Sequence, residues 1–237
     1  MREFVISDIH GAFKALKQVF QQSNFDYSVD KLFCLGDVCD GWPEVDKVFD
    51  ELLKIKNLIY IKGNHDVWAY EYYITSYPDP MWNMQGGLNT VKSYDNNMMP
   101  IEHLNLIKNA PCYVIDNNRL FIHGGYHWRL PIEELKNEED FYWNRRMFDA
   151  AYHFAFDKEF KKDNVKQLTP YKEVYVGHSP TLNYKKITKP IKALEITNVD
   201  TGASYDGPLS LLDITNNKLY QSEIVKGLYP GIKARGL

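Results

Sequence analysis

The chain has 237 residues, of which 44% are hydrophobic and 25% are charged, and its formal net charge is -3. This length suits one large domain, expected over residues 1–237, better than two small ones. The near-neutral charge argues against a general nucleic-acid-binding protein, whose surface is normally basic. It does not exclude a small phosphorylated ligand, because bound metal ions can supply local positive charge.

The three cysteines are Cys34, Cys39 and Cys112, and no Cys-x-x-Cys pair occurs. An odd number without pairing motifs argues against a disulfide framework and favours a reducing compartment. The sequence opens on a strand-like segment rather than a basic and then apolar leader, and no apolar stretch approaches the length of a membrane span. We therefore expect a cytoplasmic, monomeric protein with no membrane partner.

The first sixty residues alternate between strand and helix patterns. Short apolar runs at 4–6, 32–35 and 58–61 are typical of buried strands. Apolar residues spaced by three or four predict helices over 13–20 and 43–52. This alternation predicts an α/β fold in which helices cover a mixed or parallel sheet.

The middle of the chain is less regular. Residues 77–97 are rich in Pro, Asn, Gly, Met and Trp, which is typical either of an ordinary surface loop or of a rim over a site. A short helix is expected over 101–109. Residues 113–115 and 120–122 read as a hairpin turned by the three polar residues between them.

The last hundred residues contain both patterns. Residues 133–162 are charged and aromatic with a helical character, and 174–176 read as another buried strand. From 194 to 220, strand-like runs alternate with turns at 200–202 and 216–217. No repeat, low-complexity segment or linker interrupts the chain.

Five short polar elements follow predicted strands, and each joins a carboxylate, imidazole or amide to a glycine: residues 8–11, 36–40, 63–66, 123–125 and 177–179. Glycine lets the backbone turn sharply and leaves room for a ligand. Four of the seven histidines fall in these elements. A single histidine at such a turn is more often structural, but this combination favours a metal site. Oxygen and nitrogen donors without thiolates suit Mn, Fe or Zn.

In this order, the five elements resemble the calcineurin-like metallophosphoesterase superfamily. The resemblance is to its phosphoprotein phosphatase branch, which includes bacterial and phage serine/threonine phosphatases and symmetrical diadenosine tetraphosphate hydrolases. It extends from Asp8 to the segment 198–203. It implies a four-layer fold, in which a central β-sandwich of mixed sheets is flanked by helices. It also implies two divalent metal ions, with manganese expected first and iron or zinc as alternatives.

The resemblance implies a role for each matching residue. Six residues would hold the metals: Asp8 and His10 on one, Asn64, His123 and His178 on the other, and Asp37 between them. Asn64 would also face the phosphate. His65 would be the general acid, and Asp40 would be the carboxylate that orients it and favours its charged form.

The sequence departs from the family where an Asp-Arg-Gly triplet is usual. Here Gly41 stands at the position of the arginine that clamps the phosphate, and lysine contacts are not equivalent to that bidentate clamp. The neighbouring Trp42 is expected to wall the pocket and contact the substrate. Residues 143–145 resemble a Trp-x-Arg element of bacterial relatives, which assigns phosphate binding to Arg145, with Arg146 as the competing candidate.

Three further residues lie in or near the motifs. Asp66 reads as a turn or helix-cap residue rather than a catalytic one, and Cys39 reads as a packing residue. His127 follows the fourth motif closely and, with its neighbour Trp128, is expected to line the pocket.

The leading functional hypothesis is hydrolysis of a phosphomonoester by a two-metal-activated hydroxide, of the serine/threonine phosphatase type, on a phosphorylated protein or a small phosphoester. A nucleotide or dinucleoside-polyphosphate hydrolase is the alternative, because Trp42, Trp82 and Trp128 could stack a base. An alternative of another class is a catalytically silent metal-binding interaction module, which only the missing arginine supports.

Overall fold

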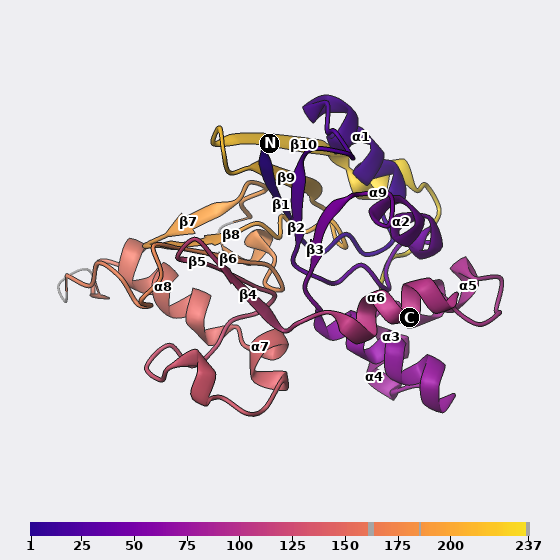
Figure 1. The fold of residues 1–237 in the computed structure, drawn as a ribbon, viewed down its shortest axis with the longest axis horizontal. Coiled ribbons are helices and arrows are strands. Elements are labelled where there is room, and N and C mark those ends of the chain that lie inside the picture. The colour runs from indigo at the N-terminus through magenta and orange to yellow at the C-terminus, as the bar shows by residue number, and fades with distance from the viewer. Residues whose placement is uncertain (161–163, 185, 236–237) are drawn as a thin grey trace.

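Two five-stranded sheets lie in the centre of the computed structural model, which describes residues 1–160, 164–184 and 186–235. Helices cover their outer faces (Figure 1). The first sheet has the order β10-β9-β1-β2-β3. Its strands are β1 (Glu3–Ile6), β2 (Lys31–Cys34), β3 (Asn57–Tyr60), β9 (Pro208–Asp213) and β10 (Lys218–Ile224).

The second sheet has the order β4-β5-β6-β8-β7. Its strands are β4 (Tyr113–Asp116), β5 (Arg119–Ile122), β6 (Glu173–Val176), β7 (Ile191–Ala193) and β8 (Ile196–Asn198). In the first sheet β1, β2 and β3 are parallel, and in the second sheet β5, β6 and β8 are parallel. Antiparallel strands complete both. Both sheets are therefore mixed, which confirms the expected α/β architecture.

The helices fall into three groups. The first sheet is covered by α1 (Phe13–Ser23), α2 (Val45–Leu52) and α9 (Val225–Leu228), and the second by α7 (Glu139–Trp143) and α8 (Arg146–Phe156). Between them along the chain come α3 (Asn64–Thr75), α4 (Pro80–Met84), α5 (Gly87–Ser93) and α6 (Ile101–Asn109), on the right of Figure 1. The described residues also form the 3-10 turns η1 (Ile132–Glu134) and η3 (Thr181–Asn183). Within the described ranges, no helix is both long and apolar enough to cross a bilayer.

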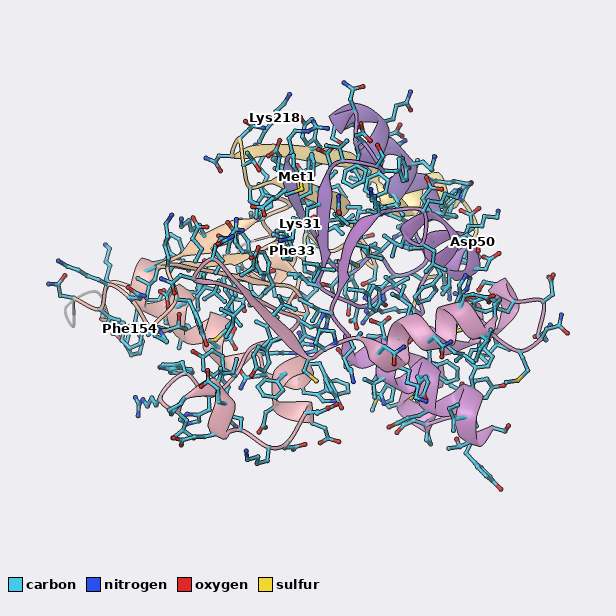
Figure 2. The ribbon with its side chains drawn as sticks, viewed as in Figure 1. Met1, Lys31, Phe33, Asp50, Phe154 and Lys218 are labelled. Atoms are coloured by element: carbon cyan, nitrogen blue, oxygen red, sulfur yellow. The ribbon has the colours of Figure 1, made fainter. Side chains whose placement is uncertain are left out.

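Strand alternation builds three apolar layers. On β1, Phe4 and Ile6 face the helices, whereas Val5 joins the layer between the sheets. In that middle layer the rings of Phe33 from β2, labelled in Figure 2, and Phe121 from β5 stack with centroids 3.7 Å apart. Successive side chains of a strand point to opposite faces, and here both faces are buried, which explains the continuous apolar runs.

Local expectations from the sequence are largely met. The helix expected over 101–109 is α6, and the hairpin of β4 and β5 turns at Asn117 and Asn118, whose φ angles are 52° and 60°. These left-handed angles suit a two-residue hairpin turn. The irregular region 77–97 contains the two short helices α4 and α5. The helical character expected over 133–162 corresponds to η1, α7 and α8, although residues 161 and 162 lie outside the described residues.

Candidate metal centre

The five polar elements meet where strands of both sheets end. Four of the expected metal ligands follow strands of the first sheet, two after β1 and one each after β2 and β3, and the other two follow β5 and β6 of the second. Parallel strands present their carboxyl ends at one edge of a sheet, so loops that are distant in sequence converge there. All six expected ligands are buried, each at most 4% exposed: Asp8, His10, Asp37, Asn64, His123 and His178.

Asp37 lies at the middle of this cluster. Its Oδ2 is 3.7 Å from Nε2 of His10 and 3.3 Å from Nε2 of His123. Two groups of potential ligand atoms, each within 4.8 Å, share Asp37: one with His10 and His65, the other with His123 and His178. The remaining two expected ligands adjoin these groups: Asp8 Oδ1 lies 3.8 Å from His10 Nε2, and Asn64 Oδ1 lies 3.2 Å from His123 Nε2.

The histidines are oriented as metal ligands require. Nδ1 of His10 lies 2.9 Å from the carbonyl oxygen of Cys39, and Nδ1 of His123 lies 2.7 Å from that of Leu35. Because a carbonyl can only accept, each Nδ1 carries the proton and leaves the lone pair of Nε2 to the cluster. Nε2 of His178 is buried without a hydrogen-bond partner among the described residues. A divalent cation would satisfy this nitrogen, and the donor set fits Mn, Fe or Zn.

The electrostatics also suit a cation. Burial would raise the pKa of Asp37, but the nearby His123 and His65 outweigh burial and hold this pKa well below its usual range. Burial, reinforced by His123, lowers the pKa of His178 well below its usual value. An ionised carboxylate and a neutral imidazole are the forms that bind metal ions. Burial would lower the pKa of His123, but Asp37 outweighs burial and raises this pKa to about 9, so a cation would bind there in exchange for a proton of His123.

The backbone at the cluster is unusual. Five non-glycine residues have left-handed φ angles between 49° and 71°: Asp8, His10, Asp37, Asp40 and His178. Such conformations are uncommon for residues with a Cβ and concentrate at functional sites. Glycine also lets neighbouring loops approach each other closely. A Cβ on Gly63 would lie only 2.1 Å from Oδ1 of Asp37.

Asp66 holds the loop that carries Asp37. Its carboxylate accepts hydrogen bonds from the backbone N–H of Asp37 at 2.8 Å, Val38 at 2.9 Å, Cys39 at 3.1 Å and Gly63 at 3.0 Å. Asp66 lies in the first turn of α3, so the expected cap is confirmed, and it also joins the loops after β2 and β3. Cys39 is fully buried in the apolar layer between the first sheet and its helices, as expected of a packing residue.

His65 and Asp40 form a buried pair beside the cluster. Nδ1 of His65 lies 2.6 Å from Oδ2 of Asp40, and the His65 ring lies edge-on to that of His10. The other oxygen of Asp40 accepts from Trp82 Nε1 at 2.8 Å and from Thr90 Oγ1 at 2.7 Å. The carboxylate is therefore fixed from both sides, and it fixes the imidazole in turn.

A pocket of about 920 Å³ is lined by none of the six ligands and by neither His65 nor Asp40, but its residues Trp143 and Arg145 contact His178. Arg145 connects the pocket to the cluster, because it lines the pocket and donates to the carbonyl oxygen of His178 and, at 3.0 Å, to Ser179 Oγ. Arg146, the competing candidate, also lines the pocket. His127 and Trp128 line it as expected.

Sequence reasoning missed an aromatic rim between the acid pair and this pocket. The ring of Trp68 lies 5.2 Å from that of His65 and 4.9 Å from that of Trp143. The Trp143 ring lies 5.8 Å from that of His178. These two indoles occupy the place that the sequence interpretation gave to other tryptophans.

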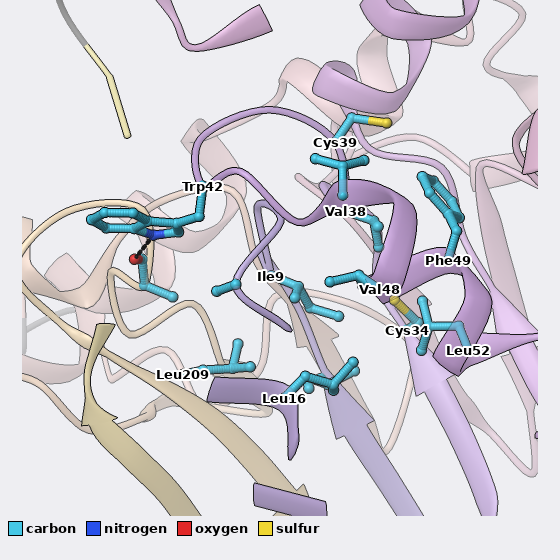
Figure 3. Close-up of a cluster of buried hydrophobic side chains, with 14 of the residues drawn as sticks. Ile9, Leu16, Cys34, Val38, Cys39, Trp42, Val48, Phe49, Leu52 and Leu209 are labelled. Atoms are coloured by element: carbon cyan, nitrogen blue, oxygen red, sulfur yellow. Dashed lines mark hydrogen bonds between the residues drawn. The ribbon is translucent and has the colours of Figure 1, made fainter. Parts of the chain in front are cut away.

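Trp42 requires a correction. Its side chain is 2% exposed and stacks on Tyr229. Its Nε1 donates to the carbonyl oxygen of Ala203 at 2.8 Å, the dashed line at Trp42 in Figure 3. Because the indole N–H has a buried acceptor and the ring has apolar neighbours, Trp42 packs in the core and does not line the pocket. Trp82 is buried as well and contributes its N–H to Asp40.

Arg235 was missed altogether. Its Nη2 lies 2.8 Å from Nε2 of His10, across a sequence separation of 225 residues. It belongs to no motif, so local sequence patterns gave no signal for it.

Comparison with known proteins agrees with this geometry. The family model described as calcineurin-like phosphoesterase matches residues 1–206. The asymmetrical bis(5'-nucleosyl)-tetraphosphatase PrpE of Bacillus cereus is 22% identical over 227 residues, which is 89% of each chain. Serine/threonine-protein phosphatase 2 of Escherichia coli is 34% identical over 84 residues, which is 35% of this chain and 38% of that protein.

Solved structures share the fold. A metallophosphoesterase from Sphaerobacter thermophilus superposes with a TM-score of 0.57 at 19% identity, covering 94% of this chain and 89% of that one. The cold-active protein-tyrosine phosphatase of a Shewanella species gives 0.59 at 13% identity, covering 94% and 80%. With the family model matching most of the sequence, the chain belongs to the calcineurin-like phosphoesterase family and is a metallophosphoesterase.

Proposed function

We propose that the chain hydrolyses phosphoesters at a two-metal centre. The six ligands are those predicted: Asp8, His10, Asp37, Asn64, His123 and His178. Asp37 lies between two donor groups, and Nε2 of His178 has no hydrogen-bond partner within the described ranges; both observations support this assignment. When bound, two divalent cations supply an activated hydroxide and neutralise charge on the phosphoryl oxygens. The mixed oxygen and nitrogen donors suit manganese, with iron and zinc as alternatives.

The observation that carries the mechanism is the 2.6 Å contact between His65 Nδ1 and Asp40 Oδ2. With Nδ1–H donated to the carboxylate, the ring is held in one orientation. A second proton on Nε2 passes to the ester oxygen as the bond between that oxygen and phosphorus breaks. Such a positioned acid contributes about 10²–10⁴-fold to the rate. His65 also lies within reach of one donor group, so its role as an acid must be separated from a role as a ligand.

Leaving-group dependence separates the two roles. For His65→Ala, we expect kcat to fall by about 10²–10⁴-fold on phenyl phosphate, whose leaving group needs a proton. The loss should be much smaller on p-nitrophenyl phosphate, because nitrophenolate departs unprotonated. Metal content, measured on the same preparations, should be unchanged. Equal losses on both esters would remove the acid role, and a lost metal ion would make His65 a ligand.

A nucleotide substrate is favoured by the pocket beside Arg145. Its volume of about 920 Å³ falls in the range of small-molecule sites. Its lining includes Trp128 and Trp143, whose faces can stack on a base, together with Arg129 and Arg146 for phosphate oxygens. The matching asymmetrical tetraphosphatases align along nearly the whole chain, whereas the serine/threonine phosphatase aligns along a third of it. We therefore favour a dinucleoside polyphosphate over a phosphoprotein, with Arg145 contacting its phosphates.

A substrate comparison tests this preference. Turnover of diadenosine tetraphosphate should exceed that of a phosphoserine peptide and of a mononucleotide. Trp128→Leu should raise KM for the dinucleotide and leave p-nitrophenyl phosphate unaffected, because that ester has no base to stack. Faster turnover of the peptide, or no effect of Trp128→Leu, would favour the phosphoprotein substrate.

A further inference from the structure

We propose that Arg235 binds the phosphoryl group at this centre, with Nε and Nη2 of its guanidinium facing two phosphoryl oxygens. This inference rests on the proposed function, because it assigns Arg235 to the substrate of that same site. It adds a positively charged group on the His10 side of the cluster, whereas Arg145 lies on the His178 side.

One end of the guanidinium is fixed in place. Nη1 of Arg235 donates to Gln85 Oε1 at 3.0 Å and to the hydroxyl of Tyr205 at 2.8 Å. Its Cζ lies 4.8 Å from the centroid of the Tyr205 ring, within the range of a cation–π contact. These contacts hold the group without using its other edge.

The other edge, formed by Nε and Nη2, lies beside His10 and is not fully hydrogen-bonded within the described residues. Nε of Arg235 is buried and has no hydrogen-bond partner among the residues that the structure describes. Nη2 donates to Nε2 of His10. A metal ion bound to that nitrogen would displace this contact and leave Nη2 for another acceptor. Nε–H and Nη2–H point the same way, and this fork matches two oxygens of a phosphate. A buried donor without an acceptor is costly, and a phosphoryl oxygen would satisfy it.

The segment that carries Arg235 is packed against the loop that carries Gly41. Asn89 Nδ2 donates to the carbonyl oxygens of both Gly41 and Lys233, the latter at 3.0 Å. Ala234 is buried, and a Cβ added to Gly86 would lie 2.5 Å from its carbonyl oxygen and 2.7 Å from the nitrogen of Gly41. Arg235 therefore reaches the cluster from an ordered, close-packed position.

Gly41 cannot supply a guanidinium itself. Its φ is +80°, and a Cβ there would lie 2.9 Å from Cβ of His10. A side chain at this position would be strained and would collide with a metal ligand. Arg235 therefore brings a guanidinium to the same side of the cluster as Gly41, although the two residues are distant in sequence.

Phosphate binding tests the assignment without relying on turnover. Inorganic phosphate is titrated by calorimetry into manganese-loaded wild type, Arg235→Lys and Arg235→Gln. Arg235→Lys keeps the charge and the aliphatic stem, so folding should hold, as equal unfolding temperatures would verify. We expect phosphate affinity to fall at least about tenfold in both variants, because the fork is lost. The matched control is Lys226→Gln, which removes an exposed positive charge from the neighbouring helix α9 and should change nothing.

A titration of manganese into the metal-free proteins tests the competing role, in which Arg235 only fills the metal site and does not bind phosphate. If Arg235 only fills the metal site, its variants will bind manganese more tightly with unchanged phosphate affinity, and the proposal is overturned. Weaker phosphate binding in the variants, with no ester hydrolysed by wild type, would support Arg235 while refuting the proposed function. Ester hydrolysis with unchanged KM and phosphate affinity in the variants would refute Arg235 alone.

Discussion

Two of the His–Asp pairs in this chain differ in their surroundings. His65 lies 2.6 Å from Asp40 beside the metal cluster, and His103 lies 3.1 Å from Asp50 between α6 and α2. The Asp40 side chain is 0% exposed, whereas that of Asp50 is 66% exposed. Only the first pair combines a carboxylate fixed by other donors with a position beside the cluster. The second serves as an internal control.

Replacing Asp40 should impair the acid without removing it. In Asp40→Asn, the amide keeps the shape of the side chain but loses the carboxylate that accepts from His65. We expect kcat on phenyl phosphate to fall by about ten- to a hundredfold, part of what the complete acid contributes. Asp50→Asn should leave kcat unchanged. The proposed role of Asp40 would not survive an equal loss in both variants, or no loss in the first.

At the scale of elements, the sequence predicted most of the site because its signals are local. Asp8, Asp37 and His123 each lie within three residues of a strand end, and apolar runs make those ends visible. The two predictions that the sequence could not make correctly, for Arg235 and Trp42, depend on tertiary packing. Arg235 reaches His10 across 225 residues, and no pattern indicates that contact. Because Trp42 follows a motif, the sequence predicted it to line the pocket. In the structure its indole is buried and donates to the carbonyl oxygen of Ala203, which is distant in sequence.

The layer of helices over the first sheet contains a charge network centred on Glu51. Its carboxylate accepts from Lys17 at 2.8 Å, from Lys54 at 2.7 Å and from the hydroxyl of Tyr27. Burial would raise the pKa of Glu51, but these hydrogen bonds outweigh burial and lower the pKa to about 2. Glu51 thus ties α2 to α1 and to the loop that follows α1.

The network predicts how stability varies with pH. The folded pKa of about 2 lies below the ordinary value of 4.5, so the stabilisation is fully present above pH 4.5 and is lost as pH falls towards 2. Because both lysines are largely exposed, we expect Glu51→Gln to cost only about 1–2 kcal/mol at pH 7. In urea unfolding at several pH values, this difference should shrink below pH 4.5. Glu223→Gln, at an exposed glutamate, should show little difference at any pH, and a constant cost for Glu51→Gln would contradict the assignment.

At the scale of the whole molecule, the candidate centre joins the two sheets. Asp8, Asp37 and Asn64 come from loops of the first sheet, and His123 and His178 come from loops of the second. Elsewhere, packing between the sheets is dominated by apolar contacts such as that of Phe33 with Phe121. A metal ion held from both sides would therefore act as a link between the halves of the sandwich, and binding should couple to global stability.

Metal loading should accordingly stabilise the wild type against unfolding. A ligand that binds only the folded state contributes about 2.7 kcal/mol when its concentration is a hundred times its Kd. Chemical unfolding with and without manganese measures this gain. His178→Ala should lose much of the gain, because it removes a ligand from the second sheet whose Nε2 has no other partner among the described residues. His153→Ala, at an exposed histidine that pairs with Asp157 and is not one of the six expected ligands, should keep it. An equal gain in His178→Ala would mean that manganese binds without linking the sheets through this residue, because the linkage requires ligands from both sides.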